Sequence, residues 1–284
     1  MWPGTTWVVE IAQCFYICWM SPRSLIQGAL PLIKEVGAFL RSEVKNFDRA
    51  VIDLKSQNQL VSYVDITAEK RLVEGLLKLT PDAGFVTEEA TVARNRRAGI
   101  VWIVDPLDGT TNFVHGIPVF SISVGLMMDG KLCGGIVYEI NLDECFYAWE
   151  GGQAFCNEKE IHVSKALTLE DSLIATGFPY YDYEQMEEYL NLLKVLMKGT
   201  RGLRRLGSAA VDLAYVACGR FDAFFEYGLA AWDVAAGAFI VQQAGGKVCD
   251  FSGGENFLFG KEIVASQPRV SKEFLNLVRH HFKG

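Results

Sequence analysis

The chain has 284 residues, of which half are hydrophobic and 21% are charged, with a formal net charge of −7. This length and composition suffice for a large globular core and exclude a disordered or low-complexity protein. The acidic balance, without a stripe of Lys and Arg interleaved with aromatic residues, argues against direct binding of nucleic acid. The longest basic cluster, RGLRRL at 201–206, is too short to change that interpretation.

The first twenty residues, MWPGTTWVVEIAQCFYICWM, are apolar and aromatic. They lack the basic start and the small-residue cleavage site of a secretory signal. Glu10 and Gln13 interrupt a run already short of the ~20 residues that a spanning helix needs. We interpret residues 1–22 as an irregular extension, with Met20 as a working start, and expect no membrane association. A signal peptide or anchor is the alternative. Residues 23–284 are expected to form one domain.

Seven cysteines are spread along the chain without a C-x-x-C pair. This pattern indicates free thiols in a reducing compartment, so we expect a cytoplasmic protein. The four histidines argue against a His-rich zinc site.

Apolar residues recur at helical spacing from Ser24 to about Asn46, which predicts an amphipathic helix. An extended, turn-rich segment follows, and a second helix runs through ITAEKRLVEGLLKL with Asp65 as its expected N-cap. Short apolar strands are then predicted at 84–87, 100–104, 120–128, 132–139 and 145–150. Their close succession indicates an antiparallel sheet flanked by helices.

The second half alternates between strands and helices. Strands are predicted at 172–177, 221–226 and 263–266, and helices at 184–197, at 208–219, from Trp232 onward and at the C-terminus. No linker rich in Pro, Gly or Ser divides the two halves. The sequence therefore predicts one continuous α+β domain with two sheets.

Acidic residues follow two of the predicted strands. Glu88 and Glu89 come after GFVT, Asp105 and Asp108 come after IVWIV, and Asp233 lies in the first turn of the helix near Trp232. Singly, each has an ordinary interpretation as a surface acid, a turn residue or a helix cap. Because strand ends and helix starts gather at one edge of a sheet, Glu88, Asp105 and Asp233 can also converge.

Converging carboxylates repel one another, and hard divalent cations remove that repulsion. Mg²⁺ prefers carboxylate and carbonyl oxygens and keeps waters and phosphate oxygens in its shell. Gly109 permits close approach of a ligand, and Thr110 and Thr111 can cap a helix whose free N–H groups bind an anion. The stretch DPLDGTTNF at 105–113 thus predicts metal-assisted hydrolysis of a phosphate ester. The Thr110 hydroxyl, beside a carboxylate such as Asp65, can orient the attacking water.

These segments together resemble the inositol monophosphatase family, in the lithium-sensitive, Mg²⁺-dependent phosphatase superfamily. The resemblance rests on WIVDPLDGTTNFVHGIPVFSISVGL at 102–126, WDVAAGAFIVQQAGG at 232–246, TEEA at 87–90 and LVSYVD at 60–65. It covers the chain from about Leu25 to the C-terminal helix. It implies a layered α-β-α-β-α sandwich of the inositol monophosphatase and fructose-1,6-bisphosphatase type, an α+β fold, and a homodimer.

The resemblance also implies roles for single residues around two or three Mg²⁺ ions. Glu88, Asp105 and the carbonyl of Leu107 would bind the first ion. Asp105, Asp108 and Asp233 would bind the second, and Glu88 would bind a weaker third ion through waters.

Asp65, Thr110 and Glu88 would be the catalytic residues, with Thr110 and Asp65 positioning the nucleophilic water. The backbone amides of Gly109 and Thr110 would hold the phosphate. Lys55 would lie on a loop near the metals. The substrate pocket would be completed by Asp108, Gly207, Ser208, Ala209, Glu226 and Asp233.

Two features leave the substrate open. Gln59 stands where the family commonly has an acid, which would loosen the Lys55 loop or weaken the third metal. GTTNF at 109–113 favours myo-inositol monophosphates over nucleotide 3′-phosphates, yet relatives with similar motifs act on fructose bisphosphate, histidinol phosphate or NADP. A regulatory protein on the same scaffold, associated with RNA-processing or transcription machinery, is the alternative from a different class.

Overall fold

The structure is a computed structural model that describes residues 21–46, 53–56, 59–61, 63–93, 95–96, 98–178 and 183–282, without the side chains of residues 46 and 53–61. Residues 1–20 of the predicted extension, 1–22, lie outside this description, and Pro22 already belongs to a helix. The helices are α2 (Pro22–Asn46), α3 (Tyr63–Leu79), α4 (Thr110–His115), α5 (Met186–Gly199), α6 (Ala209–Ala217), α7 (Ala231–Gln243) and α8 (Pro268–His281).

The strands form a hairpin and two larger sheets. The hairpin contains β1 (Asp53–Ser56) and β2 (Gln59–Val61). The seven-stranded sheet contains β3 (Gly84–Thr87), β4 (Ile100–Asp108), β5 (Ser121–Met128), β6 (Lys131–Glu139), β7 (Glu144–Trp149), β8 (Ala154–Cys156) and β9 (Lys159–Ile161). The five-stranded sheet contains β10 (Leu173–Thr176), β11 (Gly202–Arg204), β12 (Ala223–Tyr227), β13 (Lys247–Cys249) and β14 (Glu262–Ser266).

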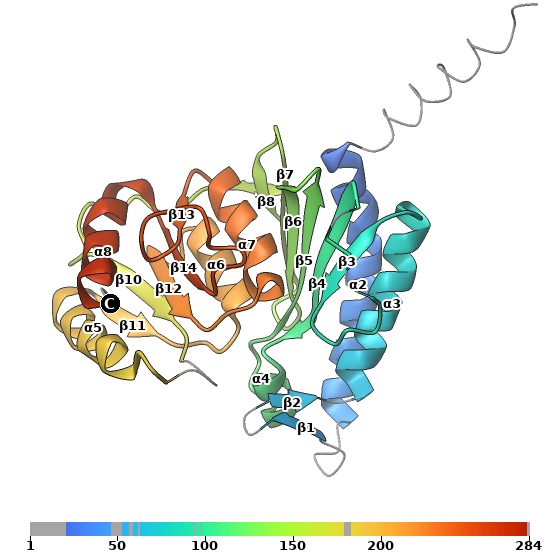
Figure 1. The fold of residues 1–284 in the computed structure, drawn as a ribbon, viewed down its shortest axis with the longest axis horizontal. Coiled ribbons are helices and arrows are strands. Elements are labelled where there is room, and N and C mark those ends of the chain that lie inside the picture. The colour runs from blue at the N-terminus through green and yellow to red at the C-terminus, as the bar shows by residue number, and fades with distance from the viewer. Residues whose placement is uncertain are drawn as a thin grey trace, which may run out of the picture.

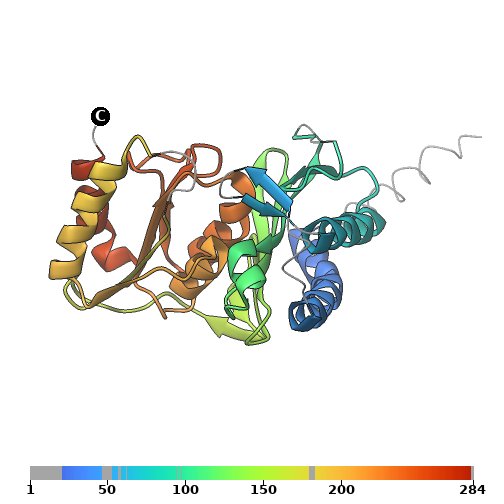
Figure 2. The ribbon, with the colours of Figure 1, turned by 90° about the horizontal axis from the view of Figure 1, so that it is seen from below.

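These elements stack as five layers (Figure 1). The helices α2 and α3 cover one face of the seven-stranded sheet, and α6 and α7 lie between the two large sheets. The helices α5 and α8 cover the far face of the five-stranded sheet, and a view from below shows the same succession of layers (Figure 2). This arrangement confirms the predicted α+β fold with its α-β-α-β-α order.

The seven-stranded sheet has helices on both faces, and its strands are accordingly apolar without alternation. In β4 every residue after Ile100 is buried. The strand order follows the chain from β3 to β9, and every pairing from β4 to β9 is antiparallel, as predicted for the strands from β4 to β7. The pair β3 and β4 is parallel, which corrects the prediction for that edge. Two parallel neighbours end at the same side of the sheet, so the residues after β3 lie beside the end of β4.

The helix α2 forms because its apolar residues recur on one face, and that face is buried against the seven-stranded sheet. Ile26 packs over Gly134, where an added Cβ would lie 2.7 Å from the Ile26 side chain. The second helix of this layer, α3, packs against α2 and brings Gly75 against Leu32. Among the described residues, no helix is long and apolar enough to cross a membrane.

The helix α7 lies unusually close to the seven-stranded sheet. A Cβ on Gly125 would be 2.7 Å from the Cβ of Ala235, and one on Gly135 would be 2.6 Å from the Ala236 carbonyl oxygen. Small residues on both surfaces therefore let backbone approach backbone. This contact fixes the start of α7, where Asp233 lies, relative to β4 and β5.

Three details differ from the sequence-based expectation. The strand β4 continues to Asp108, with a register shift between Asp105 and Asp108, whereas the prediction ended it at residue 104. The helix α3 begins at Tyr63, so Asp65 lies in its first turn and is not the N-cap. The three-residue strands β8, β9, β11 and β13 were not expected.

Candidate active site

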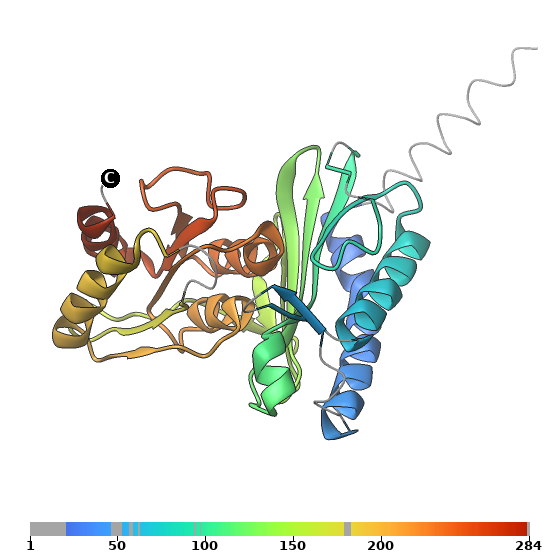
Figure 3. The same ribbon diagram turned by 60° about the horizontal axis from the view of Figure 1, so that its bottom comes forward.

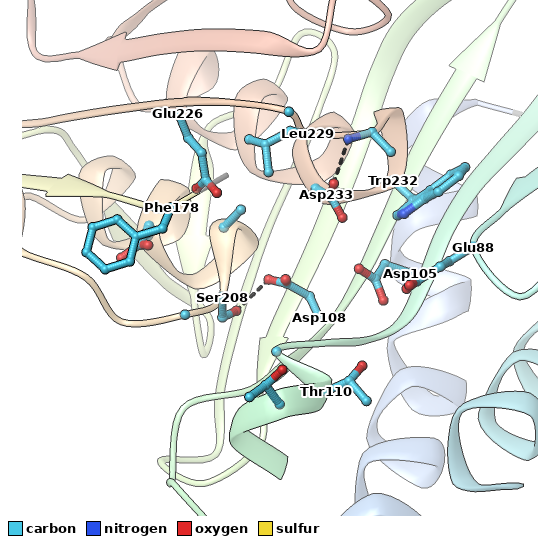
Figure 4. Close-up of a pocket in the computed structure, with 18 of the residues that line it drawn as sticks. Glu88, Asp105, Asp108, Thr110, Phe178, Ser208, Glu226, Leu229, Trp232 and Asp233 are labelled. Atoms are coloured by element: carbon cyan, nitrogen blue, oxygen red, sulfur yellow. Dashed lines mark hydrogen bonds between the residues drawn. The ribbon is translucent and has the colours of Figure 1, made fainter. Parts of the chain in front are cut away.

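A pocket of about 180 Å³ opens where the two large sheets face each other across α6 and α7 (Figure 4). The seven-stranded half supplies the residue after β3, the end of β4 and the start of α4. The other half supplies the start of α6, the end of β12 and the start of α7. The predicted residues that line this pocket are Glu88, Asp105, Leu107, Asp108, Gly109, Thr110, Gly207, Ser208, Ala209, Glu226 and Asp233.

Two predicted residues are not among those that line the pocket. Asp65 reaches it indirectly, because the Thr110 hydroxyl lies 3.1 Å from Asp65 Oδ1. Lys55 lies on β1, and its side chain is outside the description. The hairpin of β1 and β2 lies beside α4 (Figure 3).

Asp105, Asp108 and Asp233 form the densest acidic group of the pocket. One carboxylate oxygen from each residue lies within 4.8 Å of the others. Asp105 is buried, Asp108 is nearly so, and Asp233 is partly exposed toward the pocket. Figure 4 shows Asp105 and Asp233 near one another, Asp108 directed toward Ser208, and Glu88 beside Asp105.

The electrostatics of this group are unfavourable for three bare carboxylates. Burial, and then the charges of Glu88 and Asp108, raise the pKa of Asp105 well above its ordinary value. Burial, together with the charges of Asp108 and Glu88, likewise raises the pKa of Asp233. A cation among these carboxylates would relieve both effects, since it compensates the repulsion and the lost hydration.

Asp108 differs from its neighbours because the start of α6 donates hydrogen bonds to it. Burial raises its pKa to about 6, while the bonds from the Ser208 hydroxyl and the Ala210 N–H favour the ionised form. The Ala210 bond measures 2.8 Å. These bonds, both to Asp108 Oδ2, tie the end of β4 to the other half of the molecule.

The donors of this group are carboxylate oxygens, which suit a hard divalent cation such as Mg²⁺ better than a soft metal. Arg205 is the one basic side chain among the described residues that line the pocket. Its charge lowers the pKa values of Asp108 and Glu226, and it is not among the main influences on Asp105 or Asp233. The residues present therefore fit a divalent cation near Asp105 and Asp233.

The turn after β4 presents backbone N–H groups to the same pocket. Gly109 is the N-cap of α4, with φ of 94°, and no side chain caps the helix, so Thr110 and Thr111 do not act as the predicted caps. A Cβ on Gly109 would lie 3.1 Å from the Val119 carbonyl oxygen. Positive φ and close packing both favour glycine there. The Thr110 hydroxyl also lies 3.0 Å from the Leu107 carbonyl oxygen, an alternative acceptor to Asp65.

The far end of the pocket is formed by Glu226, which is 6% exposed. A Cβ on Gly177 would lie 2.0 Å from the Glu226 carboxyl group, so only glycine leaves space for that side chain. Burial, and then the charge of Asp233, raises the pKa of Glu226 well above its ordinary value. This end thus combines a confined carboxyl group with the backbone of Ser208 and Ala209.

Sequence reasoning missed several residues that line the pocket. Gly177, Phe178, Arg205 and Asp212 belong to segments in which no motif was recognised, and the Arg205 guanidinium lies over the Phe178 ring at 5.3 Å. Asp212 is buried, and burial followed by the charge of Glu226 raises its pKa. The cluster RGLRRL was noticed only as too short for nucleic acid, although it delivers Arg205 to the pocket.

This fold with its acidic pocket is that of a phosphatase scaffold, and comparisons with known proteins agree. The model of the inositol monophosphatase family matches residues 21–282. The chain therefore belongs to the inositol monophosphatase family.

Named relatives fall into two groups. The Nus factor SuhB of Pasteurella multocida is 38% identical over 90% of this chain and 96% of its own length. The inositol-1-monophosphatase of Rhizobium meliloti is 38% identical over 92% of this chain and 98% of its own. The crystal structure of the extragenic suppressor protein suhB of Bartonella henselae superposes with a TM-score of 0.84, at 39% identity over 92% of this chain and 99% of that one.

Proposed function

We propose that the protein is a Mg²⁺-dependent phosphomonoester hydrolase that converts myo-inositol monophosphates to inositol and phosphate. The observation that carries this proposal is the group of Asp105, Asp108 and Asp233, with ligand oxygens within 4.8 Å, beside the Thr110 and Asp65 pair. Family membership supports phosphatase chemistry in general. The choice of an inositol phosphate rests on the leaving-group end of the pocket.

The residues that would hold the ions are those around the end of β4. Glu88, Asp105 and the Leu107 carbonyl would bind one Mg²⁺, and Asp105, Asp108 and Asp233 would bind another. Glu88 would serve a third, weaker ion through water. Bound Mg²⁺ would supply charge neutralisation for the phosphoryl and leaving oxygens and would lower the pKa of the attacking water.

The protein's own groups perform the remaining tasks. Asp65 accepts a hydrogen bond from the Thr110 hydroxyl, so the Thr110 oxygen is oriented to accept a hydrogen bond from the attacking water. The N–H groups of Gly109 and Thr110 bind the phosphate oxygens at the start of α4. With the Thr110 oxygen on one side of the phosphorus and Glu226 on the other, the leaving group departs away from the water.

Glu226 accepts hydrogen bonds from hydroxyl groups of the leaving group, and the Ala209 backbone and Ser208 line the same end. A polyol offers several such donors. A sugar phosphate or bisphosphate also does so, and a nucleotide or histidinol phosphate does so less well. A carboxylate at a hydroxyl subsite therefore favours polyol and sugar phosphates over nucleotide and histidinol phosphates, and the family resemblance at GTTNF favours inositol phosphates among them.

A panel of phosphomonoesters assayed for phosphate release with and without Mg²⁺ tests this proposal. We expect Mg²⁺-dependent release, fastest from inositol 1-phosphate and inhibited by millimolar Li⁺. If phosphate is released fastest from fructose bisphosphate or a nucleotide, that compound replaces inositol 1-phosphate as the proposed substrate. Absence of Mg²⁺-dependent release from every ester would reject the function.

A second candidate function follows from the relatives named Nus factor SuhB, which are as similar to this chain as those named inositol-1-monophosphatase. A role of that kind would be carried by surfaces outside the pocket. Capture of transcription machinery from a lysate by the Asp105→Asn variant as well as by the wild type would support it. Loss of capture in that variant would tie the association to the active site.

We also propose that residues 23–284 form one catalytic domain, that the protein is a cytoplasmic homodimer, and that it binds no nucleic acid directly. A chain that starts at Met20 is expected to keep full activity. Sedimentation analysis should give the mass of a dimer, and retention by immobilised RNA or DNA at physiological salt would contradict the last of these proposals.

A further inference from the structure

Glu69 is a buried carboxylate outside the pocket that the proposed reaction does not use. It lies on α3, one helical turn after Asp65, so both side chains share one face of the helix. Asp65 is 1% exposed and Glu69 is 0% exposed. A fully buried carboxylate is unfavourable unless hydrogen bonds compensate it, so its partners indicate its role.

The partners of Glu69 all belong to the loop after β3. Glu69 Oε2 accepts a hydrogen bond of 2.7 Å from the Glu89 N–H. Glu69 Oε1 accepts two bonds, each of 2.7 Å, from the N–H and the hydroxyl of Thr91. Bonds to an ionised acceptor are among the stronger ones in proteins, and three on one buried group define the loop closely.

The backbone between these two donors adopts an uncommon conformation. Ala90 has φ of 52°, in the left-handed region that residues with a Cβ rarely occupy. This conformation turns the N–H groups of Glu89 and Thr91 toward the same carboxylate.

Glu88 lies between two fixed points as a result. On one side its N–H donates to the Val104 carbonyl at 3.2 Å, which continues the pairing of β3 with β4. On the other side the Glu69 carboxylate holds the next residue in the chain, Glu89. Figure 4 shows the Glu88 side chain beside Asp105 at the edge of the pocket.

We propose that Glu69 is a positioning residue for the metal site, holding Glu88 in place through the loop backbone. One face of α3 then positions two parts of the site. Asp65 orients the Thr110 hydroxyl, and Glu69 holds the loop that carries Glu88. This inference rests on the proposed function, because it assigns Glu88 to a bound cation. It concerns affinity for metal rather than the chemical step.

Glu69→Gln tests the inference, because the amide keeps the size of the side chain but offers one acceptor oxygen in place of two. Outer groups that orient ligands change metal affinity by about 10- to 100-fold. We expect the Mg²⁺ concentration for half-maximal activity to rise about tenfold, with kcat at saturating Mg²⁺ within about twofold of the wild type. The binding of Mn²⁺, measured by electron paramagnetic resonance without substrate, should weaken by a similar factor.

Thr91→Val is the milder variant, since it removes only the hydroxyl bond to Glu69. It should raise the Mg²⁺ concentration for half-maximal activity, and weaken the binding of Mn²⁺, by about threefold each. Glu139→Gln is the matched control. Glu139 is also buried and also accepts hydrogen bonds from N–H groups of a turn, at Asn141 and Leu142, but that turn does not line the pocket. It should lose stability without any change in Mn²⁺ affinity.

The outcomes separate this inference from the proposed function. Unchanged Mn²⁺ affinity in Glu69→Gln, or an equal loss in Glu139→Gln, would overturn the positioning role even if the wild type is an active phosphatase. A wild type that binds Mn²⁺ but hydrolyses no phosphomonoester would overturn the proposed function. The Mn²⁺ affinity of Glu69→Gln relative to the wild type would still decide the positioning role. A wild type that binds no Mn²⁺ would reject both.

Discussion

The two sheets contribute to the pocket in different ways. The half built on the seven-stranded sheet brings acids from adjacent strand ends, with Glu88 after β3 and Asp105 and Asp108 at the end of β4. The half built on the five-stranded sheet brings hydrogen-bonding groups from separate elements, such as Ser208 at α6 and Glu226 on β12. Dense negative charge thus comes from one half and the shape of the leaving-group end from the other.

Asp233 is the exception, because it comes from α7 of the second half and joins the acids of the first. We therefore expect that different mutations can change metal binding and substrate choice separately. The helix α7 links the two, because it carries Asp233. Variants in the first half should change rate or metal requirement for every substrate. Variants at the leaving-group end should change the ranking of substrates.

The largest effect is expected from Asp105→Asn. The side chain would serve both proposed ions, and loss of ~4 kcal/mol of charge stabilisation corresponds to a fall in kcat of about 10³-fold. The same variant should unfold at a higher temperature than the wild type in EDTA, because it removes a buried carboxylate that its neighbours repel. Activity assays and thermal melts measure the two changes, and normal hydrolysis by this variant would rule out the proposed site.

Thr110→Val comes next. Removing the hydroxyl that Asp65 orients should lower kcat by about 10²-fold for every substrate, as expected for a lost group in proton transfer. The Mg²⁺ requirement should stay the same, since the Leu107 carbonyl and the acids are intact. Thr110→Ser, which restores the hydroxyl, should recover most of the rate. Equal defects in the Val and Ser variants would mean that the hydroxyl alone does not account for the loss and that the packing of the Thr110 side chain matters as well.

Glu226→Gln should produce a smaller and selective effect. A hydrogen bond to a charged group contributes about 1.5 kcal/mol or more, so kcat/KM for inositol 1-phosphate should fall about tenfold. For an aryl phosphate, whose leaving group has no hydroxyl donors, the change should stay within about twofold. Gly177→Ala, whose Cβ would meet the Glu226 carboxyl at 2.0 Å, should reproduce the selectivity. An equal loss of kcat/KM for both esters would contradict the expectation that the leaving-group end changes only the ranking of substrates.

The smallest effect is a dependence of stability on pH without metal. The pKa values of Asp105, Glu226 and Asp233 are raised in the folded protein, and that of Asp108 is about 6. Folded protein therefore holds these protons more tightly than unfolded protein. The stability they confer is present below the ordinary pKa of about 4 and is lost as the pH rises through the folded values.

In EDTA, the melting temperature should accordingly be several degrees lower at pH 8 than at pH 5. Added Mg²⁺ should raise the melting temperature more at pH 8, where the acids are ionised and repel one another. Differential scanning calorimetry at both pH values measures this. An equal increment at the two pH values would argue that Mg²⁺ does not bind at these carboxylates.

The elements with strong local patterns were predictable from the sequence. The apolar run GFVT matches β3 residue for residue, and the helical spacing after Ser24 matches α2 to within two residues. Glu88, Asp105 and Asp233, for which the sequence suggests convergence, line one pocket, whereas Glu89 does not. In each instance the signal lies within one segment, as hydrophobic periodicity or as a carboxylate at a strand end.

What escaped prediction depends on contacts between distant segments. Nothing local marks Gly177 as the space for Glu226, or Arg205 as a pocket residue, because each role arises only when separate strands meet. The parallel pairing of β3 with β4 is likewise a property of the whole sheet. Glu226 itself was identified only through family resemblance, since FDAFFE reads locally as an ordinary buried strand.

The close contact of α7 with the seven-stranded sheet limits how the pocket can open. Where Ala235 and Ala236 meet Gly125 and Gly135, no flexible side chain lies between the backbones to absorb a displacement. A hinge that swung one half away from the other would have to break this contact. We therefore expect substrate and product to pass by movement of the chain around the pocket rim, with the two halves behaving as a single rigid body during turnover.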